Sequence, residues 1–355
     1  MKKIVGKIKT KKVFATILMI AVLSNLVACV PDFGFLRSSS SKSTVSNVTK
    51  IKKEKKKEKK NEKKNEKKKV EIKETEKKEV EIIDTTTPLY AKTISFDMSC
   101  PYATYSVINS GTCTLYKPNP NYLGDSKIVP RATYASSSIT IAVNAGHGTK
   151  DGDKVKTYCH PDFSEKVATG TTKAGELKAI AVSGGTILKD GMKEADVNLL
   201  VACALKDKLL ASGYSVLMIR ESDDVQLDNV ARTVLANKYA DAHIAIHFDS
   251  TKNDKGIFYI SPANVKSYRN MEPLKSNLNR IIDFGTSVIN TFKNMGQKIY
   301  GKNGYIYGDL TQLSYSTIPS IDIELGDKGT TIDEKSIDIF AEGIKKGIDV
   351  YFKKN

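Results

Sequence analysis

Histidine is scarce in this sequence. Only four histidines occur among 355 residues, so any site that uses imidazole chemistry must draw on His147, His160, His243 and His247. His147 follows an apolar run, residues 139–143, which predicts a buried strand. Gly146 and Gly148 allow the backbone to turn sharply on either side of it. A histidine on the loop after a buried strand lies where open α/β sheets bind their ligands.

The globular part of the chain lacks an excess of charge, although the whole sequence carries a net charge of +16. Residues 1–28 contain six lysines and no acidic residue, and residues 50–81 contain 16 lysines and nine glutamates. These two segments carry +13 of the total, so the remainder is close to neutral. A nucleic-acid-binding protein concentrates its basic charge on the folded domain. We therefore exclude nucleic acid as a partner.

The N-terminus lacks an apolar run long enough to cross a bilayer comfortably. Residues 13–27 are apolar, but a spanning helix needs about 20 such residues, and a basic segment followed by a shorter run is typical of a signal peptide. The run ends in Leu26-Val27-Ala28-Cys29, which resembles the lipobox of bacterial lipoproteins. We predict a signal peptide over residues 1–28 and lipidation of Cys29, which anchors the mature chain to the outer face of the cytoplasmic membrane. A plain signal peptide or a signal anchor is the alternative.

Residues 51–82 lack aromatic side chains and contain few apolar ones, so they cannot bury a core. Residues 30–49 are rich in serine and threonine. We therefore predict that residues 29–87 form a disordered tether, which holds the domain away from the membrane. Its lysines could also attract anionic lipid headgroups or wall polymers.

Residues 88–135 contain several prolines and tyrosines and short alternating runs, and we predict a small β-rich or irregular lead-in segment. Cys100 and Cys113 could close a disulfide loop within it, because an exported chain permits disulfides. Cys203 lies in a helical pattern, and we expect it to be buried and inert.

From residue 139 onward, strand and helix patterns alternate. We predict strands at residues 139–143, 214–219, 241–247, 256–260 and 320–325, and helices at 194–212, 228–237, 272–295 and 332–352. A Gly- and Thr-rich excursion, residues 149–192, interrupts the alternation after the first strand. The pattern predicts an α/β domain over residues 136–355, with a largely parallel central sheet flanked by helices.

Four polar residues fall at the ends of these elements. His147 follows the first strand, His247 ends the strand 241–247, Glu324 lies at the end of the last strand, and Glu194 begins the first helix. The carboxyl ends of parallel strands share one edge of a sheet, so these side chains can meet there. Two histidines and one carboxylate form a catalytic zinc site with an open fourth position. A further carboxylate can then accept a proton from the attacking water.

His243 and His247 are four residues apart, and on a helix both could bind one metal ion. The alternating isoleucines between them favour a strand, in which they lie about 13 Å apart. Only one of them can join the site, and we choose the strand-end His247. The adjacent pair Cys159-His160 is a weak indication of a second metal site, and we favour a structural role in the loop.

The ordered motifs resemble one family, the zinc-dependent N-acetylmuramoyl-L-alanine amidases of the type 3 catalytic domain. These enzymes cleave peptidoglycan between the lactyl group of N-acetylmuramic acid and L-alanine. The resemblance covers about residues 139–350 and rests on AGHG with His147, KEADVNL with Glu194, the strand-end Arg220, RTVLAN from Arg232 to Asn237, IAIHFD with His247, and IPSIDIELG with Glu324.

The resemblance implies a twisted sheet flanked by helices and a single Zn²⁺ ion. It implies that His147, Glu194 and His247 bind the zinc and that Glu324 is the catalytic glutamate. Arg232 and Asn237 are expected to support the site rather than to take part in catalysis.

Three features depart from the family pattern. Asn144 stands where members usually have an aspartate, and Asp327-Lys328-Gly329 replaces a segment that often reads Gly-Phe followed by Ser/Thr-Asn. The segment between His147 and Glu194 is also longer than usual. These differences concern the surroundings of the site and the shape of the substrate groove, because no ligand or base is missing.

The sequence therefore predicts a monomeric, lipid-anchored, zinc-dependent peptidoglycan amidase that acts outside the cytoplasmic membrane. One alternative is a catalytically silent wall-binding lipoprotein, which a missing ligand or base would mark. The other is a zinc peptidase that cleaves the stem peptide, which would expose a different amine in the product.

Overall fold

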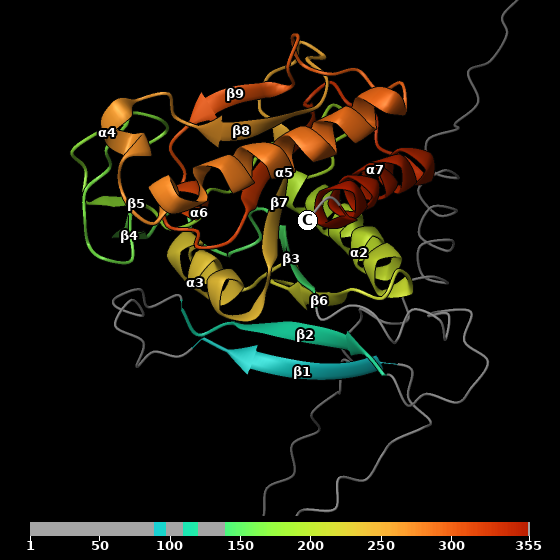
Figure 1. Ribbon diagram of the computed structural model, residues 1–355, viewed down its shortest axis with the longest axis horizontal. Coiled ribbons are helices and arrows are strands. Elements are labelled where there is room, and N and C mark those ends of the chain that lie inside the picture. Colours follow the sequence, from blue (N-terminus) through green and yellow to red (C-terminus); the bar gives the residue numbers. More distant parts are fainter. Residues whose placement is uncertain (1–88, 97–108, 120–138, 354–355) are drawn as a thin grey trace, which may run out of the picture. The chain divides into compact units, whose positions relative to one another are not determined.

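The computed structural model describes residues 89–96, 109–119 and 139–353 (Figure 1). The predicted signal peptide, Cys29, the tether and Cys100 lie outside these residues. Cys113, the other cysteine of the predicted pair, is a buried free thiol in this part of the chain. Cys203 is only partly buried, whereas the sequence predicted a buried, inert thiol. None of the described helices is both long enough and apolar enough to cross a membrane.

A mixed eight-stranded sheet forms the centre of the fold, with the strand order β1-β2-β6-β3-β7-β10-β8-β9. Its four middle strands are parallel. They are β6 (Ser215–Met218), β3 (Thr140–Ala145), β7 (Ala242–Asp249) and β10 (Ser320–Asp327). Nearly all residues of β6, β3, β7 and β10 are buried, and β6 and β3 have nearly continuous apolar sequences, whereas apolar and polar residues alternate in β10.

Both edges of the sheet contain antiparallel pairings. On one side, β2 (Thr112–Pro118) pairs antiparallel with β6 and with β1 (Leu89–Ser95), so the described parts of the lead-in segment extend the main sheet. On the other side, β8 (Phe258–Pro262) runs antiparallel to β10 and parallel to β9 (Tyr305–Gly308). The connection from β7 to β8 is too short for the crossover that a parallel strand requires. The predicted α/β fold is confirmed, and the sheet is mixed.

Helices cover both faces of the sheet (Figure 1). One face packs against α2 (Glu194–Ala211), α5 (Leu274–Asn294) and α7 (Glu334–Lys353), whose apolar side chains share one core cluster with β3, β7 and β10. The other face packs against α3 (Asn229–Tyr239). The short helices α4 (Lys266–Arg269) and α6 (Thr311–Ser314) lie near β8 and α5. The four long helices occupy the segments that the sequence predicted.

The ends of α2 and α3 agree with local sequence chemistry. Glu194 and Asp196 lie in the first turn of α2, where the helix dipole favours acidic side chains. Asp228 caps α3, because its carboxylate accepts a hydrogen bond from the backbone N–H of Ala231 at 2.7 Å. The first residue of α2, Glu194, contacts His147 after β3 and His247 near the end of β7, so α2 begins at the edge of the sheet where the parallel strands end.

The excursion after β3 contains a small separate sheet. Its two strands, β4 (Lys156–Tyr158) and β5 (Lys178–Ile180), pair antiparallel. Beyond this hairpin, residues 183–193 return to the start of α2, and an isolated bridge joins Ile187 to Lys193. The excursion therefore begins and ends beside the carboxyl edge of the central sheet.

Candidate metal centre

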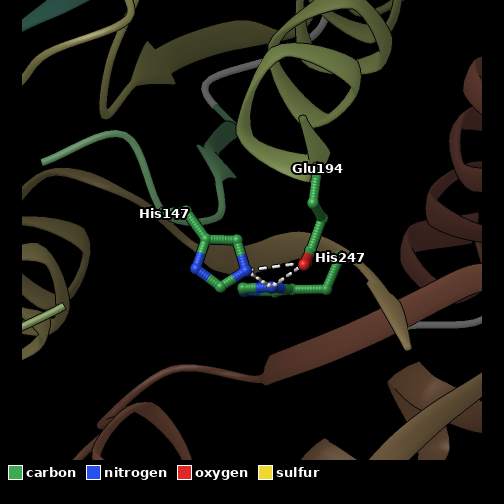
Figure 2. A group of neighbouring side chains, drawn as sticks. All are labelled: His147, Glu194 and His247. Atoms are coloured by element: carbon green, nitrogen blue, oxygen red, sulfur yellow. Dashed lines mark hydrogen bonds and ion pairs between the residues drawn. The ribbon is translucent and has the colours of Figure 1, made fainter. Parts of the chain in front are cut away.

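Three side chains from different elements converge at the carboxyl edge of the sheet (Figure 2). His147 lies on the loop after β3, Glu194 is the first residue of α2, and His247 lies near the end of β7. The Nε2 atom of His147 is 2.7 Å from the Oε1 atom of Glu194. The Nδ1 atom of His247 is 3.1 Å from each of these two atoms.

This donor set fits a metal ion. The three groups each offer one ligand atom, and these atoms lie within 4.8 Å of one another. No other such group of histidine, cysteine, aspartate or glutamate side chains occurs in the described part of the chain. When the lone pairs of two imidazole nitrogens point toward one carboxylate oxygen, a cation bound to all three atoms stabilises the arrangement. Glu194 is buried and both histidines are partly exposed, so the site is open on one side.

The charges within the group shift the pKa values of its members. Burial alone would raise the pKa of Glu194, but the close contacts with the imidazole rings of His147 and His247 outweigh burial and hold that pKa well below its ordinary value. Burial acts to lower the pKa of His247, but Asp322 and Glu194 raise it to about 9. Both shifts show that the carboxylate of Glu194 stays ionised and favours a positive charge beside it.

Glu324 and Asp322 lie on the same face of β10, opposite the apolar face that enters the main core. Glu324 pairs in register with His247 of β7. Its Oε2 atom is buried and has no hydrogen-bond partner within the described structure. Burial raises the pKa of Glu324 well above its ordinary range, and the nearby carboxylates of Asp322 and Glu194 contribute to the shift. Glu324 therefore holds a proton more readily than an ordinary glutamate.

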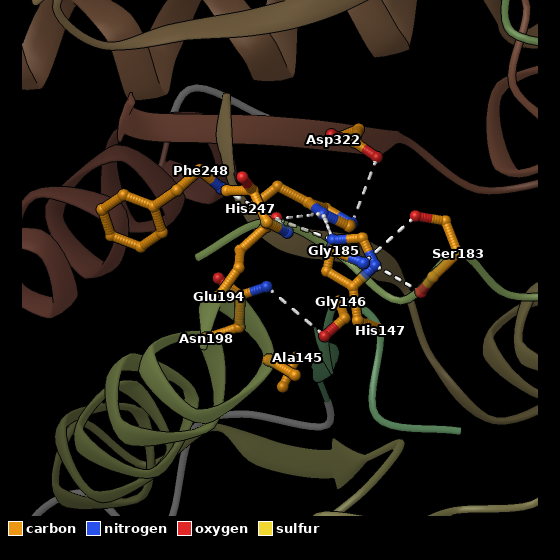
Figure 3. A network of polar contacts seen from close by, with 12 residues as sticks. Ala145, Gly146, His147, Ser183, Gly185, Glu194, Asn198, His247, Phe248 and Asp322 are labelled. Atoms are coloured by element: carbon orange, nitrogen blue, oxygen red, sulfur yellow. Dashed lines mark hydrogen bonds and ion pairs between the residues drawn. The ribbon is translucent and has the colours of Figure 1, made fainter. Parts of the chain in front are cut away.

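Asp322 is a site residue that the sequence analysis missed. Its Oδ2 atom lies 3.6 Å from the Nε2 atom of His247, on the side of the ring opposite the donor cluster (Figure 3). The Nε2-protonated tautomer of His247 is favoured by this negative charge and leaves Nδ1 free to bind a metal ion. The alternation Ile-Asp-Ile-Glu in β10 was the available signal, because it places Asp322 on the same face as Glu324.

Two buried arginines hold the loop that carries His147. Arg220 donates to the carbonyl oxygens of Ala145, Gly146 and Ala195 at 2.8, 2.9 and 2.6 Å. Arg232 donates to the carbonyl oxygen of His147 at 2.8 Å. Burial lowers the pKa of Arg220 to about 10 and that of Arg232 to about 9. Both guanidinium groups still carry a proton at neutral pH, and their hydrogen bonds fix the backbone of the loop that carries His147.

Asn144 takes part in the same arrangement, because its Oδ1 atom accepts a hydrogen bond from Arg232 at 3.1 Å. The amide at this position thus performs the acceptor role that an aspartate would also supply. Gly146 allows the loop to approach the second ligand, since a Cβ atom there would lie 2.1 Å from the ring of His247. The Gly-His-Gly turn is therefore required by packing as well as by backbone conformation.

Asn237 supports β10 from a distance. Its side-chain amide donates to the carbonyl oxygen of Tyr315 at 2.8 Å and accepts from the backbone N–H of Thr317 at 3.0 Å. These bonds fix the turn that leads into β10, and they do not reach the donor cluster. The supporting role that the sequence predicted for Asn237 stays a prediction.

The other two histidines stay away from the cluster. His243 is fully buried in β7, its Nδ1 atom lies 3.1 Å from the hydroxyl of Ser320, and burial lowers its pKa to about 3. His160 packs its ring against Tyr315 and lies 3.0 Å from the hydroxyl of Ser164. Burial lowers the pKa of His160 to about 4, so both side chains are neutral packing residues.

Comparison with known proteins gives one family and one fold. The family model described as N-acetylmuramoyl-L-alanine amidase matches residues 141–349. Two solved N-acetylmuramyl-L-alanine amidases named Ami1 have a similar fold. The apo form from Mycobacterium abscessus is 18% identical, with a TM-score of 0.50, over 61% of this chain and 100% of its own. The protein from Mycobacterium smegmatis is 18% identical, with a TM-score of 0.50, over 65% of this chain and 100% of its own. A search among curated proteins gave no significant match.

Proposed function

Because this chain belongs to the N-acetylmuramoyl-L-alanine amidase family, we propose that His147, Glu194 and His247 bind a zinc ion and that Glu324 is the general base. The chain is a peptidoglycan amidase, and the residue roles and the identity of the metal are the proposal. One observation carries it, namely the convergence of two imidazole nitrogens and one carboxylate oxygen within 4.8 Å at the carboxyl edge of the sheet.

The donor set favours zinc over other common metals. Two histidines and one glutamate with an open side form a catalytic zinc site, whereas magnesium and calcium prefer oxygen ligands. When bound, zinc polarises an amide carbonyl and lowers the pKa of a water molecule to about 7. Glu194 supplies the negative charge of the set, and the two imidazoles bind as neutral ligands.

Glu324 is suited to move the proton. It lies on the strand next to His247, and its buried Oε2 atom has no partner among the described residues. Burial raises the pKa of Glu324, so its carboxylate is a better base than an exposed one. We propose that Glu324 takes a proton from the attacking water and then delivers it to the leaving nitrogen of L-alanine. Asp322 orients His247 and does not act on the substrate.

The two rival functions make different predictions. A catalytically silent wall-binding protein would lack a ligand or the base, and the presence of His147, Glu194, His247 and Glu324 supports an active enzyme. A zinc peptidase would use the same metal chemistry but would cut within the stem peptide. Mass spectrometry of products from purified muropeptides distinguishes them, because only an amidase frees the amino group of L-alanine. Intact muropeptides after incubation with the zinc-loaded protein would contradict the proposed function.

Peptidoglycan lies outside the cytoplasmic membrane, so the amidase acts there. We further propose that Cys29 is lipidated, that residues 29–87 tether the catalytic domain to the membrane, and that the protein is a monomer. The basic segment, the short apolar run and the sequence Leu26-Val27-Ala28-Cys29 support the lipid anchor. A tethered domain would reach only the wall close to its own membrane.

A further inference from the structure

Residues 183–186, with the sequence Ser-Gly-Gly-Thr, contact two of the three proposed metal ligands. This segment lies in the last part of the excursion between β3 and α2, for which the sequence indicated no role. Figure 3 shows Ser183 and Gly185 beside the ring of His147. We call residues 183–186 the ligand-facing segment.

Ser183 fixes the tautomer of His147. Its carbonyl oxygen lies 2.7 Å from the Nδ1 atom of the imidazole. A carbonyl oxygen can only accept a hydrogen bond, so Nδ1 must carry the proton. In the neutral ring the other nitrogen, Nε2, is then unprotonated, and this is the atom that faces Glu194 and His247.

Thr186 fixes the carboxylate of Glu194. The backbone N–H of Thr186 donates to the Oε2 atom of Glu194 at 2.9 Å, and the backbone N–H of Glu194 donates to the carbonyl oxygen of Thr186 at 2.9 Å. With Oε2 held in this way, the other oxygen, Oε1, faces the two histidine nitrogens. The same segment therefore sets which atom of each ligand is presented.

Gly185 lies between these two contacts and leaves no room for a side chain. Its φ of +78° is in the left-handed region that favours glycine. A Cβ atom at this position would lie 2.8 Å from the Cδ2 atom of His147 and 3.1 Å from the Oε2 atom of Glu194. Any substitution must push one of these two side chains away from its present position.

We propose that the ligand-facing segment is a positioning element that orients His147 and Glu194 for metal binding, with Gly185 as its critical residue. This inference rests on the proposed metal site. It assigns a role to the excursion, because the hairpin of β4 and β5 and the segment that follows it deliver residues 183–186 to the site. Backbone groups that hold metal ligands from outside typically change metal affinity by about 10- to 100-fold when they are disrupted.

The test compares Gly185→Ala with a matched control, Gly191→Ala, in the full-length mature protein. Gly191 lies in the same excursion and has a similar φ of +88°, but no atom lies within 4 Å of the position that its Cβ would occupy. Both variants therefore impose similar backbone strain, and only Gly185→Ala displaces a proposed ligand. Zinc affinity is measured by competition with a chromophoric chelator, and thermal unfolding is measured in excess chelator.

We expect Gly185→Ala to bind zinc about 10- to 100-fold more weakly than the wild type, and Gly191→Ala to bind it like the wild type. In chelator, Gly191→Ala reports the loss of thermal stability from backbone strain alone, and Gly185→Ala should lose at least as much because its Cβ also contacts His147. Equal zinc affinity in Gly185→Ala and Gly191→Ala would overturn the inference. Failure of the wild type itself to bind zinc would instead refute the proposed metal site.

A second measurement needs no variant and remains decisive if Gly185→Ala does not fold. Nitrogen-15 NMR of the zinc-loaded wild-type protein reports which imidazole nitrogen of His147 carries the proton. We expect a proton on Nδ1 that exchanges slowly with solvent, because the carbonyl oxygen of Ser183 accepts it. Protonation of Nε2 would show that Ser183 does not orient this ligand, and it would overturn the inference.

Discussion

Replacing Glu324 by glutamine tests the proposed base without changing the shape of the site. The side chain keeps its length and its hydrogen-bonding reach, but an amide cannot accept a proton from water. The metal ligands are expected to stay in place, because Glu324 is on β10 and the three donors come from other elements. The variant should therefore bind one zinc ion with wild-type affinity.

The expected loss follows from what Glu324 does in the structure. Its Oε2 atom is buried and has no hydrogen-bond partner among the described residues, so it is free to accept a proton. A positioned acid–base group contributes about 100- to 10,000-fold to rate. At about 1.36 kcal/mol for each factor of ten, this corresponds to about 2.7–5.4 kcal/mol of lost transition-state stabilisation. We expect at least a 100-fold fall in kcat.

The assay follows the release of the stem peptide from purified muropeptides by mass spectrometry and measures bound zinc in the same samples. Asp322→Asn is the comparison variant, because it makes the same carboxylate-to-amide change two residues away on the same face of β10. Since Asp322 acts through His247, we expect Asp322→Asn to lose activity by binding zinc more weakly and to regain it in excess zinc, whereas Glu324→Gln should stay inactive with zinc bound. Near wild-type activity in Glu324→Gln would refute the assignment of the base. Loss of zinc would show that Glu324 is a ligand and would make Glu194 the candidate base.

Three further predictions follow from other parts of the chain. His147→Ala should lose most of its bound zinc in elemental analysis, and zinc content equal to the wild type would contradict the ligand assignment. Cys29→Ala should leave the membrane fraction or remain unprocessed, and unchanged processing with membrane retention would argue against lipidation. The folded-state pKa of His243 is lowered from 6.5 to about 3, so the unfolded chain binds this proton first and stability falls as the pH drops below 6.5. In His243→Gln, the unfolding free energy should therefore fall less steeply below pH 6.5, by up to about 1.36 kcal/mol per pH unit. Unfolding free energies measured at a series of acidic pH values check this, and the same pH dependence in the variant and the wild type would contradict it.

Local sequence patterns were sufficient to predict the parallel centre of the sheet and the four long helices. The strands β3, β7 and β10 have continuous or alternating apolar residues, and polar chemistry begins where each strand ends. This pattern was enough to predict that His147, His247 and Glu324 lie at one edge of the sheet, because parallel strands all end at the same edge. The choice of His247 over His243 followed from strand geometry, and the structure places only His247 in the cluster.

Contacts between distant segments could not be predicted in this way. Ser183 meets His147 across 36 residues of an irregular excursion, and no periodicity in that segment indicates which carbonyl will face the ring. The antiparallel edges were missed for a similar reason, since β1 and β2 join the sheet only through pairing with β6. Asp322 was overlooked although its alternation with Glu324 was visible, because its partner His247 is on another strand.

The order of strands in the sheet affects when this hydrolase can become active. The strand β10 lies between β7 and β8, although both of these precede it in the sequence. A chain synthesised only as far as β8 contains all three proposed metal ligands but has neither Glu324 nor the strand that joins these two parts of the sheet. The sheet can therefore close only once β10 is present, and the proposed base arrives on the strand that closes it. Completion of the fold and completion of the proposed catalytic set are thus a single step.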